Sequence, residues 1–316
     1  MKRLLISLLL LLAAQTARGA SEMREYALPA GTGPHDVAPA ADGAIWFTAQ
    51  RQGALGRLDP ATGKVDLLAL GEESAPHGVI LGPDGAAWVT DGGLNAILRV
   101  DGTTRAVKRF PLPDPGDPVD LNTAVFDRSG TLWFTGQSGV YGRLDLRSGA
   151  LRIWKAPRGA GPYGITATAA GIFYASLAGN YLGRIDPATG AAQVIAPPTP
   201  RAGPRRAWAD SRGAIWVSEW NDGTLARYDP AERGWKTWRL PGAQPQAYAV
   251  YVDDRDKIWV SDWGANAILR FDPADERFTA FPLPHPDAGV RQLNGRKGEV
   301  WGAESALDRL VVVGTE

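Results

Sequence analysis

Seven polar residues recur along the chain at one fixed place relative to an aromatic residue. The aromatics stand 40–45 residues apart, at Trp46, Trp88, Trp133, Phe173, Trp216, Trp259 and Trp301. Counting back 11 residues from each, or 10 in the fourth and seventh units, gives the set that we call the ring residues: His35, His77, Asn122, Tyr163, Arg205, Tyr248 and Arg291. None of the seven is apolar, which favours a functional role over a purely structural polar plug.

These residue types can handle protons and negative charge. Histidine and tyrosine can exchange a proton with a substrate. Arginine holds carboxylates and stabilises a developing oxyanion. We therefore predict three catalytic candidates: His35, His77 and Tyr163. The predicted substrate-binding residues are Asn122, Arg205, Tyr248 and Arg291.

A second recurrent position, three residues after each aromatic, is rich in carboxylates. It holds Asp91, Glu219, Asp262 and Glu304 in four of the seven units. Carboxylates without cysteine suit Mg²⁺ or Ca²⁺, while His35 and His77 leave a transition metal such as Mn²⁺ open. Glu219, Asp262 and Glu304 are the predicted metal ligands, and structural salt bridges or turn caps are an equal alternative.

The units that position these residues are each built from four short β-strands. In the second unit they are HGVIL, AWVT, AILRV and KRFPLP, separated by turns that contain Gly or Asp. Repeats of about 40–45 residues with four strands are typical of propeller blades. The sequence therefore predicts an all-β, seven-bladed β-propeller. A membrane β-barrel, with alternating strands of about ten residues, fits the unit length poorly.

The chain ends suggest how the ring closes. The seventh unit stops after its third strand, and Met23–Pro29 (MREYALP) has the pattern of a fourth strand. We expect this segment to complete the last blade, which removes an exposed sheet edge. Residues 21–316 are predicted to form one domain. Residues 1–20 begin with Met-Lys-Arg and continue into an apolar run, which indicates a signal peptide, with an uncleaved anchor as the alternative.

Composition excludes several function classes. The 34 basic and 34 acidic side chains give no net charge, so nucleic-acid binding is not expected. With no cysteine there can be no disulfide or thiolate chemistry. Motifs of serine hydrolases, zinc proteases, P-loop proteins and dinucleotide-binding proteins are absent. We expect an exported protein, periplasmic in a Gram-negative source, without a membrane span after cleavage of the signal peptide and monomeric.

The units GPHDV…DGAIWFT…GRLDP, APHGV…DGAAWVT and GPYGI…GRIDPATG resemble the streptogramin B lyase (virginiamycin B lyase-like) family over Met23–Val313. The resemblance implies Mg²⁺-dependent opening of a cyclic depsipeptide lactone by elimination, with a histidine as base. In that family the seventh inner strand begins Glu-Pro-His-Gly, whereas this chain has Gly289–Gln292, with Arg291 in place of the histidine. Tyr248 takes the place of a second histidine, and Glu304 alone matches a metal ligand.

Two kinds of function remain open from the sequence. The first is a lyase or lactonase that acts on an ester or lactone, with a shifted base and Mg²⁺ (or Ca²⁺ or Mn²⁺) as cofactor. The second is a non-catalytic propeller that binds a small anionic ligand or a protein partner. A six-bladed lactonase-type propeller is disfavoured by the count of seven units.

Overall fold

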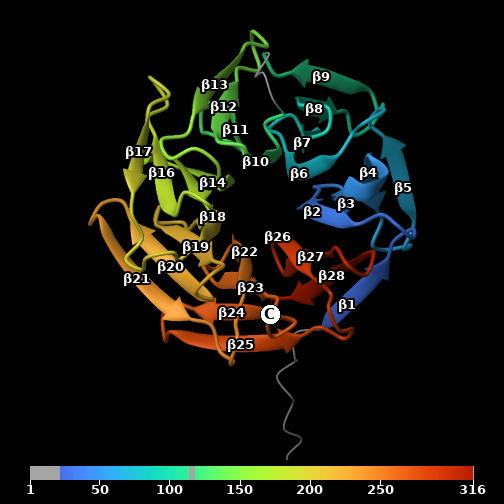
Figure 1. The fold of residues 1–316 in the computed structure, drawn as a ribbon. Helices are drawn as coiled ribbons and strands as arrows, with labels where there is room; N and C mark the ends of the chain where they lie inside the picture. The colour runs from blue at the N-terminus through green and yellow to red at the C-terminus, as the bar shows by residue number, and fades with distance from the viewer. Residues whose placement is uncertain (1–21, 114–117, 316) are drawn as a thin grey trace, which may run out of the picture.

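Seven sheets of four antiparallel strands stand in a ring in the computed structural model of the chain, which describes residues 22–113 and 118–315 (Figure 1). This confirms the predicted all-β, seven-bladed propeller. The predicted signal peptide, residues 1–20, lies outside the described residues. Among the described residues, no helix is both long enough and apolar enough to cross a bilayer.

Each blade starts beside the axis of the ring, where its first strand lies. These inner strands are β2 (Pro34–Pro39), β6 (Pro76–Leu81), β10 (Leu121–Phe126), β14 (Pro162–Thr168), β18 (Pro204–Ala209), β22 (Ala247–Val252) and β26 (Val290–Arg296). The second strands carry the recurrent aromatics: β3 (Ile45–Ala49), β7 (Ala87–Asp91), β11 (Leu132–Gly136), β15 (Gly171–Ser176), β19 (Ile215–Glu219), β23 (Ile258–Asp262) and β27 (Glu299–Glu304).

The third and fourth strands follow towards the outside of the ring. The third strands are β4 (Ala54–Leu58), β8 (Ala96–Val100), β12 (Val140–Leu144), β16 (Tyr181–Ile185), β20 (Thr224–Asp229), β24 (Ala267–Asp272) and β28 (Arg309–Gly314). The outer strands are β5 (Val65–Ala69), β9 (Val107–Pro111), β13 (Leu151–Lys155), β17 (Ala192–Ile195), β21 (Gly234–Arg239), β25 (Arg277–Pro282) and β1 (Met23–Ala27). One short 3₁₀ helix, η1 (Gln50–Gln52), follows β3.

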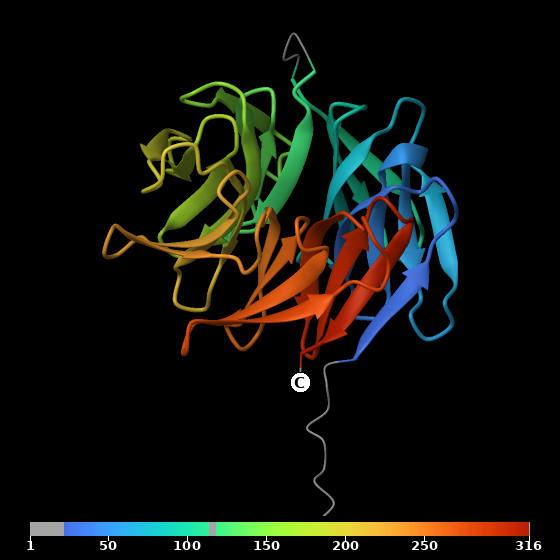
Figure 2. The same cartoon turned by 60° about the horizontal axis from the view of Figure 1, so that its bottom comes forward.

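The two ends of the chain share one blade. Strand β1 pairs antiparallel with β28, from Met23 opposite Val313 to Ala27 opposite Arg309. The sheet order is β1-β28-β27-β26, so the first strand completes the last blade (Figures 1 and 2). The predicted closure is confirmed. Because every outer strand is short and half exposed, the ring presents only short sheet edges to solvent.

The hydrophobic core lies between neighbouring blades. Trp46 of the first blade, only 2% exposed, packs in one cluster with Val79 and Val89 of the second blade. The aromatic of each second strand is buried in this way, so the recurrence found in the sequence marks the contact between blades. Dense packing of large flat side chains fixes each inner strand relative to the next.

Candidate functional site

A β-bulge in every blade directs the ring residues toward the axis. The register between the first and second strands shifts in all seven blades at the ring position, for example between Pro34 and Val37 and between Ala247 and Val250. A bulge breaks the strict alternation of side chains along a strand. Two successive residues, the ring residue and its successor, therefore lie at the axis.

A hydroxyl in the second strand holds this bulge and ties it to the next blade. Thr48 Oγ1 accepts the N–H of Asp36 at 2.9 Å and donates to the carbonyl of His77 at 2.9 Å. Ser218 repeats both contacts with Arg206 and Tyr248. Five blades have this link, through Thr48, Thr90, Thr135, Ser218 and Ser261. The backbone of the ring is thus set by residues outside the ring.

Four of the ring residues form a cluster of arginines and tyrosines at the end of the channel where the inner strands begin, which we call the ring mouth. The Tyr163 and Tyr248 hydroxyls lie 2.8 Å apart. Arg205 Nη2 donates to the Tyr163 hydroxyl at 3.1 Å, and Arg291 Nη1 donates to the Tyr248 hydroxyl at 3.3 Å. The Arg205 guanidinium carbon is 3.7 Å from the centre of the Tyr248 ring, a close cation–π contact.

The pKa values of the two tyrosines in this cluster are shifted in opposite directions. Burial, followed by Tyr248, raises the pKa of Tyr163, so Tyr163 keeps its proton and donates it to the Tyr248 oxygen. Burial also opposes ionisation of Tyr248, but Arg205, Arg206 and Arg291 outweigh it and lower the pKa of Tyr248 below its ordinary value of 10.0. Because its oxygen accepts two hydrogen bonds, Tyr248 is the proton acceptor of the cluster.

The two histidines lie next to this cluster and are fully buried. Their rings lie 3.7 Å apart, and His77 makes an edge contact with Tyr163 at 5.8 Å. Burial is the main cause that holds the pKa of both His35 and His77 well below 6.5, with Arg206 and Arg291 adding to it. Both imidazoles are therefore neutral at pH 7.

Hydrogen bonds fix the tautomer of His77. Arg206 can only donate, and its Nη1 donates to Thr123 Oγ1 at 2.8 Å. The Thr123 hydroxyl must then donate onward to Asn122 Oδ1 at 2.8 Å, which leaves the Asn122 amide N–H to donate to His77 Nε2 at 3.2 Å. His77 therefore carries its proton on Nδ1, a buried atom without a partner.

The residues that follow the ring residues form a second layer around one ion pair. Arg206 Nη2 lies 2.7 Å from Asp36 Oδ1, and Nη1 lies 3.4 Å from Oδ2. His35 Nδ1 donates to the same carboxylate at 2.8 Å. Asp36 and Arg206 are 2% and 4% exposed, so this pair is desolvated. Sequence reasoning missed both residues. The signal is charge at a position that holds Gly78, Gly164 and Ala249 in other blades.

Two aromatic side chains flank the arginines at the ring mouth. Trp263 stacks on Tyr248 with ring centres 4.7 Å apart, and Trp220 meets both of them edge-on. Arg205 and Arg291 are half-buried, and neither forms an ion pair with a carboxylate within residues 22–113 and 118–315. A cavity of about 340 Å³ lies beside Arg291 and Trp263.

The predicted metal ligands do not gather at this site. Asp262 accepts the backbone N–H groups of Gln246 at 2.8 Å and Gly264 at 2.9 Å, so it holds two loops together. Glu219 accepts the Thr224 hydroxyl at 2.5 Å, and burial raises its pKa to about 7. These contacts match the turn-cap alternative that the sequence left open.

Glu304, the third predicted metal ligand, lies at the seam between the first and last strands. Burial, and then the neighbouring Glu25, raise its pKa to about 8. Glu25 is itself held by Arg309 at 2.9 Å and His285 at 3.2 Å. Without a metal ion beside it, Glu304 therefore keeps a proton at neutral pH, and both of its carboxyl oxygens are buried without a hydrogen-bond partner among the described residues.

Among the described residues, one group has the spacing of a metal site, and its charges oppose a cation. The ligand atoms of His35, Asp36 and His77 lie within 4.8 Å of one another. However, Asp36 already forms two contacts with Arg206, and Arg205 and Arg291 add two more positive charges. Mg²⁺ also prefers oxygen ligands, of which this group offers only one carboxylate. The set does not fit Mg²⁺ as it stands.

The structure thus brings together the predicted catalytic and substrate-binding residues and separates the predicted metal ligands from them. The result is a seven-bladed propeller with a polar cluster at the ring mouth, in which two guanidinium groups have no carboxylate partner among the described residues.

Known proteins place this propeller in a family. The sequence model of the virginiamycin B lyase family matches residues 13–232, which is more than half of the chain, and the chain belongs to that family. None of the curated proteins matches the sequence.

Solved structures agree on the fold. The selenomethionine-substituted virginiamycin B lyase from Staphylococcus aureus is 20% identical, with a TM-score of 0.86 over 94% of this chain and 100% of that one. A catalytically inactive histidine-to-alanine variant of the S. aureus lyase, solved with quinupristin, is 21% identical (TM-score 0.85; 94% and 100% covered). A streptogramin B lyase is 22% identical (TM-score 0.84; 93% and 97% covered). At these identities the likeness shows the fold alone.

Proposed function

We propose that the ring mouth binds a small molecule that carries a carboxylate, through Arg205 and Arg291. The observation that carries this proposal is the pair of unpaired guanidiniums on one aromatic platform. Arginine is always charged, and its planar fork matches a carboxylate. Arg206, in contrast, is neutralised by Asp36.

The surroundings of the pair suggest the shape of the ligand. Arg291 donates from Nε to Ser305 at 2.9 Å and from Nη1 to Tyr248, which leaves Nη2 without a hydrogen-bond partner among the described residues. Arg205 has a buried Nε without a partner in the described part of the chain. Trp263 and Trp220 stand beside these donors, so a flat apolar group next to the carboxylate would stack on an indole ring.

Benzoate is expected to bind to the protein, and uncharged benzamide is not. Arg291→Met should weaken benzoate binding about ten- to a hundredfold, because a hydrogen bond to a charged group contributes about 1.5–3 kcal/mol. Isothermal titration calorimetry at low salt measures both. The control is Arg152→Met, at an exposed position on the outer strand β13, which should bind like the wild type. Equal affinity for benzoate and benzamide would contradict the proposal.

A second candidate function is ring opening of an ester by elimination, and the lowered pKa of Tyr248 favours it. In such a step the Tyr248 oxygen takes the proton next to a carbonyl, the electron pair forms a carbon–carbon double bond, and the ester C–O bond breaks with its electrons on the leaving carboxylate. Arg205 and Arg291 would stabilise the enolate-like charge. His77 borders Tyr163, and His35 borders His77, so the two imidazoles would adjust the proton position in the cluster.

The elimination candidate predicts turnover of a cyclic depsipeptide lactone such as quinupristin. Product of unchanged mass indicates elimination, whereas hydrolysis adds the mass of one water. The rate should rise with pH through the lowered pKa of Tyr248, and Tyr248→Phe should reduce it about a hundredfold or more. Turnover equal in Tyr248→Phe and wild type would exclude Tyr248 as the base. Binding of benzoate without any turnover would leave the propeller as a ligand-binding protein.

A further inference from the structure

A second cavity lies in the channel below the ion pair. It has a volume of about 310 Å³ and is lined by residues from all seven inner strands. Its floor is formed by Asp36 and Arg206, and its lining continues to the end of the channel where the inner strands end, which we call the far mouth. Leu81, Val125 and Trp208 are half-buried there, so the cavity reaches solvent on that side.

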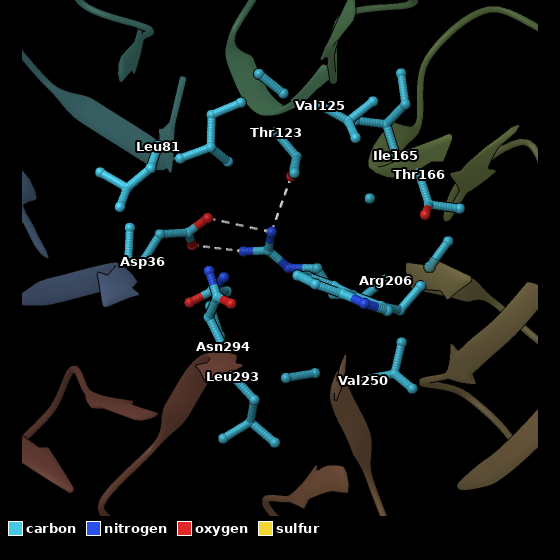
Figure 3. Close-up of a pocket in the computed structure, with 18 of the residues that line it drawn as sticks. Asp36, Leu81, Thr123, Val125, Ile165, Thr166, Arg206, Val250, Leu293 and Asn294 are labelled. Carbon is cyan, nitrogen blue, oxygen red and sulfur yellow. Dashed lines mark hydrogen bonds and ion pairs between the residues drawn. The ribbon is translucent and has the colours of Figure 1, made fainter. Parts of the chain in front are cut away.

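The walls of this cavity are mostly apolar, with Thr166 and Asn294 among them, and the floor is polar. Figure 3 shows Arg206 reaching across the channel to Asp36 and Thr123, with Leu81, Val125, Ile165, Val250 and Leu293 around it. An apolar chamber with a few convergent polar groups is the usual form of a small-molecule site, and volumes of such sites begin at about 300 Å³.

The floor offers one unused hydrogen-bonding edge. A guanidinium has five N–H donors, and Arg206 uses its Nη1 and Nη2 end on Asp36 and Thr123. Its Nε is buried and has no partner within residues 22–113 and 118–315. Nε–H and the second Nη2–H point along the remaining edge, away from both partners. A buried donor without a partner is costly, so a ligand acceptor placed there would remove that cost.

The charge of the floor selects the kind of acceptor. Asp36 lies 2.7 Å from Arg206 and cancels its charge, and His35 beside it is neutral. Arg205 and Arg291 do not line this cavity. At the free edge of Arg206 a carboxylate would therefore meet the charge of Asp36 at close range, whereas an uncharged carbonyl oxygen accepts the same two N–H groups without repulsion.

We propose that the far mouth is a binding site for a small, uncharged, mostly apolar molecule that carries a carbonyl, with the free edge of Arg206 as its hydrogen-bond donor. The site is separate from the ring mouth: its ligand meets Arg206 rather than Arg205 and Arg291. The inference therefore does not depend on the function proposed for the ring mouth.

Two probes of one shape test the site. 1-Indanone has the carbonyl, and indane lacks it. Ligand-observed NMR titration should show binding of 1-indanone and about tenfold weaker binding of indane, which leaves the Arg206 N–H edge unpaired. Indane-1-carboxylate should bind this cavity more weakly than 1-indanone.

Blocking variants locate the binding. Val125→Trp fills the cavity and should abolish 1-indanone binding, and Leu81→Trp fills it from another blade as a second blocking variant. The matched control is Val107→Trp, at an exposed position on β9, which should bind 1-indanone like the wild type. Thermal unfolding checks that each variant is folded.

Three results would overturn the proposal. They are no binding of 1-indanone, equal binding in both folded blocking variants, and equal affinity for indane and 1-indanone. Tighter binding of the carboxylate that is lost in Val125→Trp would overturn the uncharged ligand class. If indane-1-carboxylate still binds to Val125→Trp, it binds at the ring mouth, and the binding of 1-indanone alone then decides this inference.

Discussion

Asp36→Asn is expected to lower the free energy of unfolding by about 3–5 kcal/mol, because it leaves the buried charge of Arg206 without a counter-charge. Arg206 is 4% exposed, and Asp36 is the carboxylate that contacts it. The hydrogen bond from His35 Nδ1 to the same group also loses its charged acceptor, which adds to the effect. Chemical denaturation measures the change through the shift of the midpoint at constant slope.

An exposed ion pair provides the control for this variant. Asp42 lies 2.6 Å from Arg57, but its side chain is 60% exposed. Asp42→Asn should cost less than about 1 kcal/mol. The double variant Asp36→Leu with Arg206→Met should recover much of the loss, since no unpaired charge remains buried. If Asp36→Asn lowers the free energy of unfolding no more than Asp42→Asn does, Arg206 does not need Asp36 as its counter-charge.

Glu304→Gln is expected to stabilise the ring at alkaline pH and to change little at pH 4. The folded-state pKa of Glu304, about 8, lies above its ordinary value of 4.5. Between these two pH values the folded protein keeps a proton that the unfolded chain has released. The contribution of Glu304 to the free energy of unfolding is therefore complete below the unfolded pKa and is lost as the pH rises through the folded pKa. At pH 9 the loss is on the order of 5 kcal/mol.

Thermal unfolding from pH 4 to pH 9 measures this difference. The wild type should lose stability relative to Glu304→Gln as pH rises, because glutamine cannot ionise beside Glu25. Glu276→Gln is the control: Glu276 is exposed, and hydrogen bonds from Lys236 and Trp238 lower its pKa, so its pH effect has the opposite sign. Parallel pH profiles of the wild type and Glu304→Gln would show that Glu304 is not protonated in the folded ring.

The fold could be predicted because its signal is repeated seven times. One aromatic per unit packs between blades, and the spacing of these aromatics counts the blades directly. The closing strand could be predicted because Met23–Pro29 has the pattern of the outer strands. In each case a short sequence pattern is enough to assign the segment to its place in a blade.

The ring residues could be predicted by the same count. The ion pair of Asp36 and Arg206 and the contacts of the predicted metal ligands could not. A strand with strict alternation would turn Asp36 and Arg206 away from the axis, and only the bulge after Pro34 and Pro204 brings them to it. Asp262 ends a strand, where the neighbouring loops decide which groups its carboxylate meets. Neither the bulge nor the loop conformation is encoded in a periodic pattern.

The hydroxyl links between blades hold the backbone of the propeller independently of the side chains that carry its chemistry. These hydroxyls donate hydrogen bonds to backbone carbonyls at and around the ring positions, so a change of side chain at a ring position leaves the hydrogen bonds in place. They belong to Thr48, Thr90, Thr135, Ser218 and Ser261. Arginine at 291 and tyrosine at 248, where the lyases are implied to carry histidine, therefore leave the propeller intact. A propeller built in this way can change its reactive groups one blade at a time.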